Sequence, residues 1–185
     1  NLLLQPNRRR MAIRKPFNLQ KWIDENRDLL KPPVGNKNLY VEAGDFIVMI
    51  VGGPNARKDY HFNESEEWFY QLEGDINVRI QENGKAVDIP IKEGEMFLLP
   101  SHIPHSPMRG ENTIGLVIES VRKNNMTDGL MWFCDVCNHK LHEYKFPLKD
   151  IENDFQSRFK AFYASEELRT CDSCSHVMEI DERFV

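Results

Sequence analysis

Two histidines and one glutamate offer the most reactive combination in this chain. His61 precedes Glu67 by six residues, and His105 follows in a second segment punctuated, like the first, by glycine and proline. Two neutral imidazoles and one carboxylate can hold one face of an iron(II) ion and leave adjacent positions open to substrate and dioxygen. The spacing therefore predicts an open metal site, and an enzyme is the leading interpretation.

Neighbouring residues compete for two of these ligand positions. Glu66 is adjacent to Glu67, but successive side chains of a strand point to opposite faces, so only one of the two can face inward. His102 lies three residues before His105 in a predicted loop, where a surface or supporting role is the common outcome. We expect Glu67 and His105 to be the ligands. The alternative, that the two predicted histidine ligands are ordinary strand-end residues, stays open.

The four cysteines form a second candidate metal site of a different kind. They lie in two Cys-x-x-Cys pairs separated by 33 residues, namely Cys134, Cys137, Cys171 and Cys174. In a reducing compartment such pairs bind metal more often than they form disulfides or redox dithiols. Four thiolates make a closed tetrahedral site for zinc or a single iron, so a structural role is expected. Each knuckle needs a tight turn, often with positive φ, which suits Asn138 better than Ser175.

Short strands are the elements that must position these residues. Apolar runs and apolar–polar alternation predict strands over 45–51, 67–72, 76–80, 87–91, 96–99 and 113–119. Asn83 and Gly84 predict a type I′ hairpin turn between the third and fourth of these. Such a series of short strands favours a mainly β, double-sheet jelly roll over a parallel α/β sheet. Two amphipathic helices are also predicted, one from the cap at Asn18 to before Pro32, and one between the cysteine pairs.

Length and composition fit one catalytic domain with a small appendage. The 185 residues are 41% hydrophobic and carry a net charge of −5. We predict a catalytic domain over 11–122 and a rubredoxin-like or zinc-ribbon-like tail over 123–185, which begins with a polar linker at 123–129. Residues 1–10 precede Met11 and are interpreted as an upstream addition. The acidic balance argues against nucleic acid, and no run is long enough for a membrane span or a signal-peptide core. A cytoplasmic protein is expected.

The two ligand segments resemble the paired motifs of the cupin superfamily. The matching residues of the first are Gly53, His61, Glu67 and Gly74, and those of the second are Gly94, Pro100 and His105. The usual first motif has a second histidine two residues after the first, where this chain has Asn63. That departure removes one ligand and leaves a set of two histidines and one carboxylate. The resemblance implies a double-stranded β-helix.

More specifically, the chain is similar to the 3-hydroxyanthranilate 3,4-dioxygenase family, in its bacterial and fungal form with a four-cysteine tail. The similarity runs from about residue 16 to Cys174 and rests on segments 31–36, 51–57, 59–61, 66–71, 97–100, 105–109, 116–119 and 162–166. It implies iron(II)-dependent ring opening of 3-hydroxyanthranilate by dioxygen to 2-amino-3-carboxymuconate semialdehyde, the precursor of quinolinate. That reaction lies on the kynurenine route from tryptophan to NAD. A homodimer is also expected.

Four further residues are expected to handle the substrate and dioxygen. Arg109 can bind the substrate carboxylate in a bidentate fork, and Arg57 suits the stabilisation of bound dioxygen. Glu119 ends an apolar strand, and burying it would be costly without a partner such as the substrate amine or hydroxyl. It is therefore the candidate general base. Asn36 resembles an active-site asparagine of the family. Surface ion pairs for the two arginines and a solvated strand-end carboxylate are the alternatives.

Two other classes of function use a similar scaffold. One is a different cupin enzyme, such as a sugar-phosphate isomerase or a thiol dioxygenase, which would not need both Arg57 and Arg109 beside Glu119. The other is a non-catalytic sensor of a small ligand, in which the cysteine tail contacts a partner. Turnover of 3-hydroxyanthranilate by the iron-loaded protein separates these possibilities.

Overall fold

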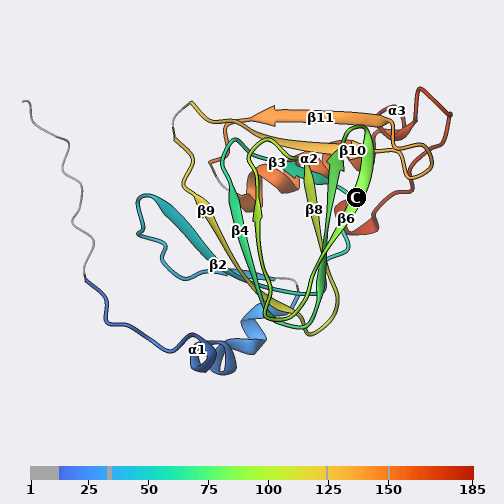
Figure 1. Ribbon diagram of the computed structural model, residues 1–185. Coiled ribbons are helices and arrows are strands. Elements are labelled where there is room, and N and C mark those ends of the chain that lie inside the picture. The colour runs from blue at the N-terminus through green and yellow to red at the C-terminus, as the bar shows by residue number, and fades with distance from the viewer. Residues whose placement is uncertain (1–12, 33–34, 124, 150) are drawn as a thin grey trace, which may run out of the picture.

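Two antiparallel β-sheets form the body of the protein. The computed structural model describes residues 13–32, 35–123, 125–149 and 151–185, so the predicted upstream addition at 1–10 lies outside the described residues. The sheets face one another as the halves of a jelly roll, with one helix below them and a helical tail above (Figure 1). The predicted mainly β fold is confirmed. Among the described residues, no helix combines the length and apolar character needed to cross a membrane.

The first sheet has five strands and carries the glutamates of interest. Its order is β1 (Asn36–Asn38), β2 (Phe46–Gly52), β9 (Ile114–Ser120), β4 (Glu67–Glu73) and β7 (Met96–Leu99). Glu67 is in register with Glu119 on the neighbouring strand. Because residues that are directly opposite in adjacent strands share a face, these two carboxylates point to the same side of the sheet.

The second sheet has six strands and carries the histidines. Its order is β11 (Lys140–Phe146), β10 (Asp128–Phe133), β3 (Tyr60–Phe62), β8 (His105–Arg109), β5 (Ile76–Glu82) and β6 (Lys85–Ile91). His61 is in register with His105 across β3 and β8. The β5–β6 hairpin turns at Asn83 and Gly84, whose φ values of 50° and 76° are those of the predicted type I′ turn.

Apolar side chains from both sheets fill the space between them. The buried members of this core are Phe69, Ile76, Val78, Ile80, Ile91, Leu99 and Val117. They occupy one part of the interior, and the predicted ligands lie at strand ends beside it. The sheets therefore hold the ligand-bearing strands rigidly, because close packing leaves little room for movement.

The N-terminal helix covers the other face of the five-stranded sheet. Helix α1 (Leu19–Asn26) begins at the predicted cap, where the side chain of Asn18 accepts from the backbone N–H of Lys21 at 2.8 Å. A 3₁₀ turn, η1 (Arg27–Leu30), ends the segment. Ile23 and Leu30 pack against Ile50 on the face opposite the jelly-roll core.

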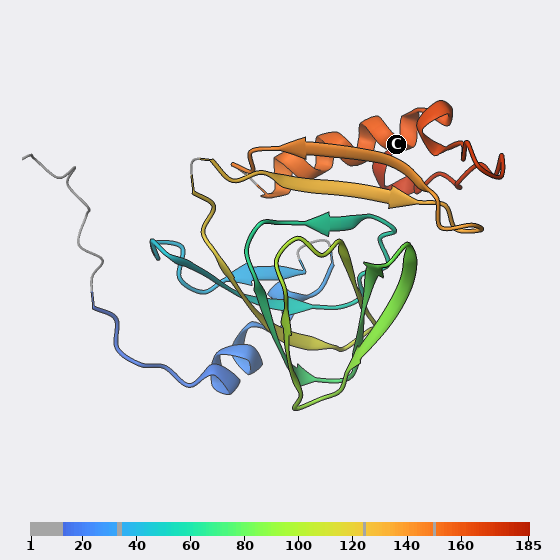
Figure 2. The ribbon, with the colours of Figure 1, turned by 45° about the horizontal axis from the view of Figure 1, so that its top comes forward.

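The tail extends the six-stranded sheet. Strand β10 pairs with β3, so that Leu130 lies opposite His61, and β10 then pairs with β11. Helix α2 (Ile151–Ala164) lies along this pair (Figure 2), followed by α3 (Glu166–Arg169) and η2 (Glu182–Phe184). An aromatic cluster joins helix and strands, with the ring of Trp132 stacked on that of Phe162 at 4.2 Å. The predicted linker reached residue 129, whereas β10 already begins at Asp128.

Candidate metal centre

The structure brings the three predicted ligands together. His61 comes from β3, Glu67 opens β4 and His105 opens β8. One ligand atom from each lies within 4.8 Å of the others. Oε1 of Glu67 is 3.6 Å from Nδ1 of His61 and 3.3 Å from Nε2 of His105. Glu67 and His105 are buried, so this is an enclosed cluster of metal-binding groups and the two histidines are not solvated strand ends.

The competing residues point elsewhere. Glu66 is exposed where Glu67 is buried, as strand alternation requires. His102 is also exposed, has a positive φ of 64° and rests its ring against Phe62 at 5.5 Å. Neither belongs to the cluster.

Each histidine is held through the ring nitrogen that faces away from Glu67. Nδ1 of His105 is 3.0 Å from the carbonyl oxygen of Ile103, and Nε2 of His61 is 2.6 Å from Oδ2 of Asp128. Both acceptors require a protonated ring nitrogen. In the neutral rings, the nitrogens that face Glu67 therefore carry the lone pairs, which is the arrangement that a metal ion needs.

Asn63 occupies the position at which the usual cupin motif has another histidine. It is buried and donates its amide N–H to Oε1 of Glu67 at 2.6 Å. Asn63, which stands in place of a motif histidine, thus orients the carboxylate of Glu67. The sequence showed the departure from the motif but not this contact.

The cluster is strongly polarised. Burial acts to raise the pKa of Glu67, but the neighbouring His105 and His61 outweigh it and lower that pKa to about 2. Burial acts to lower the pKa of His105, but the charge of Glu67 raises it above its ordinary value. Glu67 is thus a carboxylate at any working pH, and it attracts a cation, whether a proton on His105 or a metal ion.

Glu119 lies beside the cluster and already has a partner. It is buried and forms an ion pair with Arg122, which also donates to Asp128. The sequence suggested the substrate amine or hydroxyl as the group that makes burial tolerable, whereas the structure supplies a guanidinium from the chain itself. Burial and the charge of Glu67 raise the pKa of Glu119, against the effect of Arg122.

A cavity of about 430 Å³ adjoins this ion pair. Its wall includes Arg122 and the exposed Asn36, so a predicted substrate-binding residue lies in the same cavity as the partner of Glu119. The remaining lining residues are Asn38, Ile47, Met49, Val121, Leu148 and Lys149. Arg122 of the cavity wall thus contacts Glu119, the candidate base.

Arg109 is buried at the end of β8. It lies four residues after His105 on β8, on the same face, and donates to Oε1 of Gln71 at 3.3 Å. Among the described residues it has no ion pair, and burial lowers its pKa to about 10. A surface ion pair is therefore not its role. The arrangement suits an anion that arrives with the substrate.

Among the described residues, Arg57 makes no contact with the three ligands. Its Nε is 3.3 Å from Oδ1 of the buried Asp59, and its guanidinium lies 5.0 Å from the ring centre of Phe159. Arg57 and Arg109 both line the larger cavity of about 580 Å³, which none of the three ligand residues lines.

The four cysteines converge as predicted. The Sγ atoms lie within 4.8 Å of one another, with Cys134 to Cys174 at 3.6 Å and Cys137 to Cys171 at 3.5 Å, too far for disulfides. Asn138 and Ser175 have φ values of 60° and 61°, which confirms the predicted tight turns. Four cysteine sulfurs at this spacing can coordinate one metal ion tetrahedrally.

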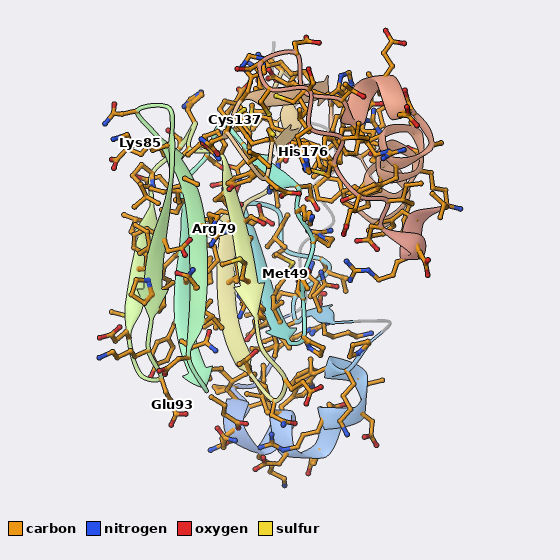
Figure 3. All side chains as sticks on the ribbon, turned by 90° about the vertical axis from the view of Figure 1, so that its right-hand side faces the viewer. Met49, Arg79, Lys85, Glu93, Cys137 and His176 are labelled. Carbon is orange, nitrogen blue, oxygen red and sulfur yellow. The ribbon has the colours of Figure 1, made fainter. Side chains whose placement is uncertain are left out.

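The first knuckle also docks on the jelly roll. Asn138 and Gln81 exchange two side-chain hydrogen bonds, at 2.8 and 3.0 Å, and the Asn138 amide donates to the carbonyl of Gly84 at 3.1 Å. Figure 3 shows Cys137 at the same end of the molecule as Lys85 of the β5–β6 turn. The cysteine site is therefore anchored to the hairpin.

Comparisons with known proteins agree over most of the chain. Residues 11–163 match the family described as 3-hydroxyanthranilic acid dioxygenase. A protein of Xanthomonas oryzae pv. oryzae named 3-hydroxyanthranilate 3,4-dioxygenase is 56% identical over 169 residues, 91% of this chain and 95% of the relative. A Bacillus cereus protein of the same name is 47% identical, over 90% of this chain and 94% of that protein. A solved cupin-2 domain protein from Shewanella frigidimarina has a TM-score of 0.43 and 18% identity over 57% of this chain and all of that chain. The matched region includes the cluster residues His61, Glu67 and His105, as well as Arg109 and Glu119. The chain belongs to the 3-hydroxyanthranilic acid dioxygenase family.

Proposed function

We propose that this chain opens the ring of 3-hydroxyanthranilate with dioxygen and forms 2-amino-3-carboxymuconate semialdehyde. The observation that carries the proposal is an enclosed two-histidine, one-carboxylate cluster together with a buried guanidinium on one of the same strands, which has no ion pair among the described residues. His105 and Arg109 are four residue steps apart, or about 13 Å along β8. Two anchoring points on one rigid strand can orient a small aromatic acid, which supports a site for this substrate class.

The donor set fits iron(II). Two imidazole nitrogens and one carboxylate oxygen are the ligands of non-haem iron oxygenases, and the possible ligand atoms of His61, Glu67 and His105 lie within 4.8 Å of one another here. When bound, iron(II) supplies open positions at which an aromatic hydroxyl and dioxygen can meet and exchange electrons. We propose these three residues as its ligands.

The chain's own side chains bind the substrate and move its proton. Arg109 would take the substrate carboxylate in a fork of two hydrogen bonds, which removes the imbalance of its buried charge. Glu119 would accept the proton of the hydroxyl, because its raised pKa makes it a stronger base than an ordinary carboxylate. Its pairing with Arg122 through Oε2 leaves acceptor capacity, since a carboxylate has about four lone-pair sites.

Asn36 and Arg57 are the two remaining residues that we assign to the substrate and dioxygen. Asn36 lines the cavity beside Arg122, which supports a part in substrate binding. Arg57 is proposed to stabilise dioxygen on the family resemblance alone, because its observed contacts are with Asp59 and Phe159.

The cysteine cluster is proposed as a structural site for iron or zinc. Four thiolates leave no open position, so the ion would fold the tail and take no part in the reaction.

We further propose a cytoplasmic homodimer that works in the route from tryptophan to NAD. The exposed side chains of Trp68, Met96 and Leu98 on β4 and β7 form an apolar row that two copies could share, and sedimentation of a Leu98→Glu variant tests it.

Reconstitution with iron(II) tests the catalytic proposal. Apoprotein loaded anaerobically with Fe(II) and mixed with 3-hydroxyanthranilate and dioxygen should give the semialdehyde absorbance and then quinolinate. His61→Ala and Glu67→Ala should lose both bound iron and product, and the adjacent exposed Glu66→Ala serves as the matched control. Fully loaded protein without product would favour another cupin enzyme or a ligand sensor. A His61→Ala protein that keeps its iron and its rate would refute the ligand assignment.

A further inference from the structure

Asp128 is a buried carboxylate on which three donor atoms converge. Nε2 of His61 lies 2.6 Å from its Oδ2, and Nη2 of Arg122 lies 2.7 Å from the same oxygen. Nε of Arg122 lies 3.0 Å from Oδ1. Asp128 is 1% exposed, and it opens strand β10 in a segment whose composition suggested a linker. Both oxygens of this buried carboxylate are therefore paired with side-chain donors.

We propose that Asp128 is the positioning residue of His61, and that Arg122 fixes Asp128 in the orientation this requires. The inference rests on the proposed metal site and concerns how one of its ligands is prepared. An ionised carboxylate only accepts hydrogen bonds, so Nε2 of His61 carries the proton. Nδ1 then carries the lone pair, and it faces Oε1 of Glu67 at 3.6 Å.

The aromatic neighbours of His61 fix the plane of its ring but cannot select a nitrogen. The ring of Phe155 lies 5.3 Å away and that of His105 lies 5.4 Å away, centre to centre. Ring contacts of this kind are equally compatible with either tautomer. Asp128 provides the contact that distinguishes Nε2 from Nδ1, and such supporting carboxylates are worth about 10- to 100-fold in metal affinity.

Arg122 holds Asp128 in the orientation that accepts a hydrogen bond from Nε2 of His61. Its guanidinium occupies both oxygens of Asp128 and also pairs with Glu119. Asparagine cannot replace aspartate here, because its single amide oxygen would have to meet three donors, and its NH₂ group would face Nε or Nη2 of Arg122. A chain of contacts thus runs from the candidate base through Arg122 and Asp128 to a metal ligand.

The direct test is the tautomer of His61. Zinc-loaded protein labelled with ¹⁵N in histidine should show Nδ1 of His61 bound to metal and Nε2 protonated in long-range ¹H–¹⁵N spectra, with the signal assigned by its loss in His61→Ala. His105 should show the reverse pattern, because its Nδ1 faces the carbonyl of Ile103. A wild-type His61 bound through Nε2 would overturn the inference.

A second test measures metal affinity without turnover. Cobalt(II) binding to apoprotein by chelator competition should weaken about 10- to 100-fold in Asp128→Asn, with an altered visible spectrum. Asp88→Asn is the matched control, because Asp88 is an exposed carboxylate held by Arg79 at 2.6 Å, and it should bind cobalt as wild type does.

The outcomes separate this inference from the proposed metal site. If Asp128→Asn keeps wild-type affinity and spectrum while His61→Ala loses cobalt, the positioning role is wrong and the metal site stands. If His61→Ala also keeps cobalt at the same affinity, the metal site itself is wrong. Should Asp128→Asn fail to fold, Arg122→Lys replaces it, since lysine cannot hold Asp128 in a fork. A several-fold loss of affinity then supports the role, and none overturns it.

Discussion

Replacing Arg109 with methionine should cost the free protein little stability and cost substrate binding a great deal. Arg109 is 4% exposed, and its hydrogen-bond partner among the described residues is Oε1 of Gln71 at 3.3 Å. Burial lowers the pKa of Arg109 to about 10. That reduction corresponds to about 3 kcal/mol against the charged form in the folded protein. The charge of Glu67 offsets burial only in part, and no carboxylate of the described residues forms an ion pair with Arg109.

The methionine removes this charge and keeps much of the side chain's length. It also leaves Oε1 of Gln71 without its donor, which costs about 1–3 kcal/mol. The free energy of unfolding should therefore be unchanged or higher by up to about 2 kcal/mol. Most substitutions of buried residues instead lower it by about 0.5–3 kcal/mol.

Substrate binding should respond in the opposite direction. Two charge-assisted hydrogen bonds to the substrate carboxylate contribute on the order of 3 kcal/mol, so their loss should raise KM by about 100-fold. Urea unfolding without substrate, and again with 3-hydroxyanthranilate under anaerobic conditions, measures both effects. Arg79→Met, which removes an exposed arginine paired with Asp88, is the control. A fall in unfolding free energy beyond 2 kcal/mol at Arg109→Met, or an unchanged KM, would refute the reasoning.

Three further predictions concern the metals and their supports. Burial acts to lower the pKa of His105, but the charge of Glu67 outweighs burial and raises that pKa. Protons therefore compete with the metal ion for His105, and the cobalt affinity of the apoprotein should fall as the pH drops below this pKa. Calorimetry in two buffers should detect proton release, and a pH-independent affinity would contradict this. Cys171→Ser should lower the melting temperature strongly and change turnover per catalytic iron little, because the ion of a four-cysteine site contributes on the order of 10 kcal/mol to a small fold. Asn138→Gly should be more stable than Asn138→Ala by about 1 kcal/mol in urea unfolding, because φ is 60° there and only glycine is unstrained; equal stabilities would argue against backbone strain.

Local sequence patterns predicted the parts of the site that depend on spacing. Glu67 could be preferred to Glu66 because strand alternation is a local rule, and both knuckles follow from residues three apart. The turn at Asn83 and Gly84 is equally local, since its conformation needs residues that tolerate positive φ. Such features survive in almost any tertiary context.

The supporting contacts could not be predicted, because they join distant segments. Asp128 is 67 residues from His61 and stood in a polar stretch that resembles a linker. Arg122 was one of many basic residues, and only folding shows that it bridges Glu119 and Asp128. Arg57 was ranked by family resemblance, and its contact with Asp59 depends on side-chain packing that no pattern encodes.

Strand β3 has only three residues, and one of them is His61. Its pairing with β8 consists of a single register contact, while β10 pairs with all three residues. A jelly roll cut off before β10 would leave a catalytic ligand on a short, open sheet edge, ready to pair with a foreign strand. The cysteine-bearing tail is therefore not a detachable module. Any rearrangement that shortens or replaces it must supply another strand beside His61, so the two halves are constrained to change together.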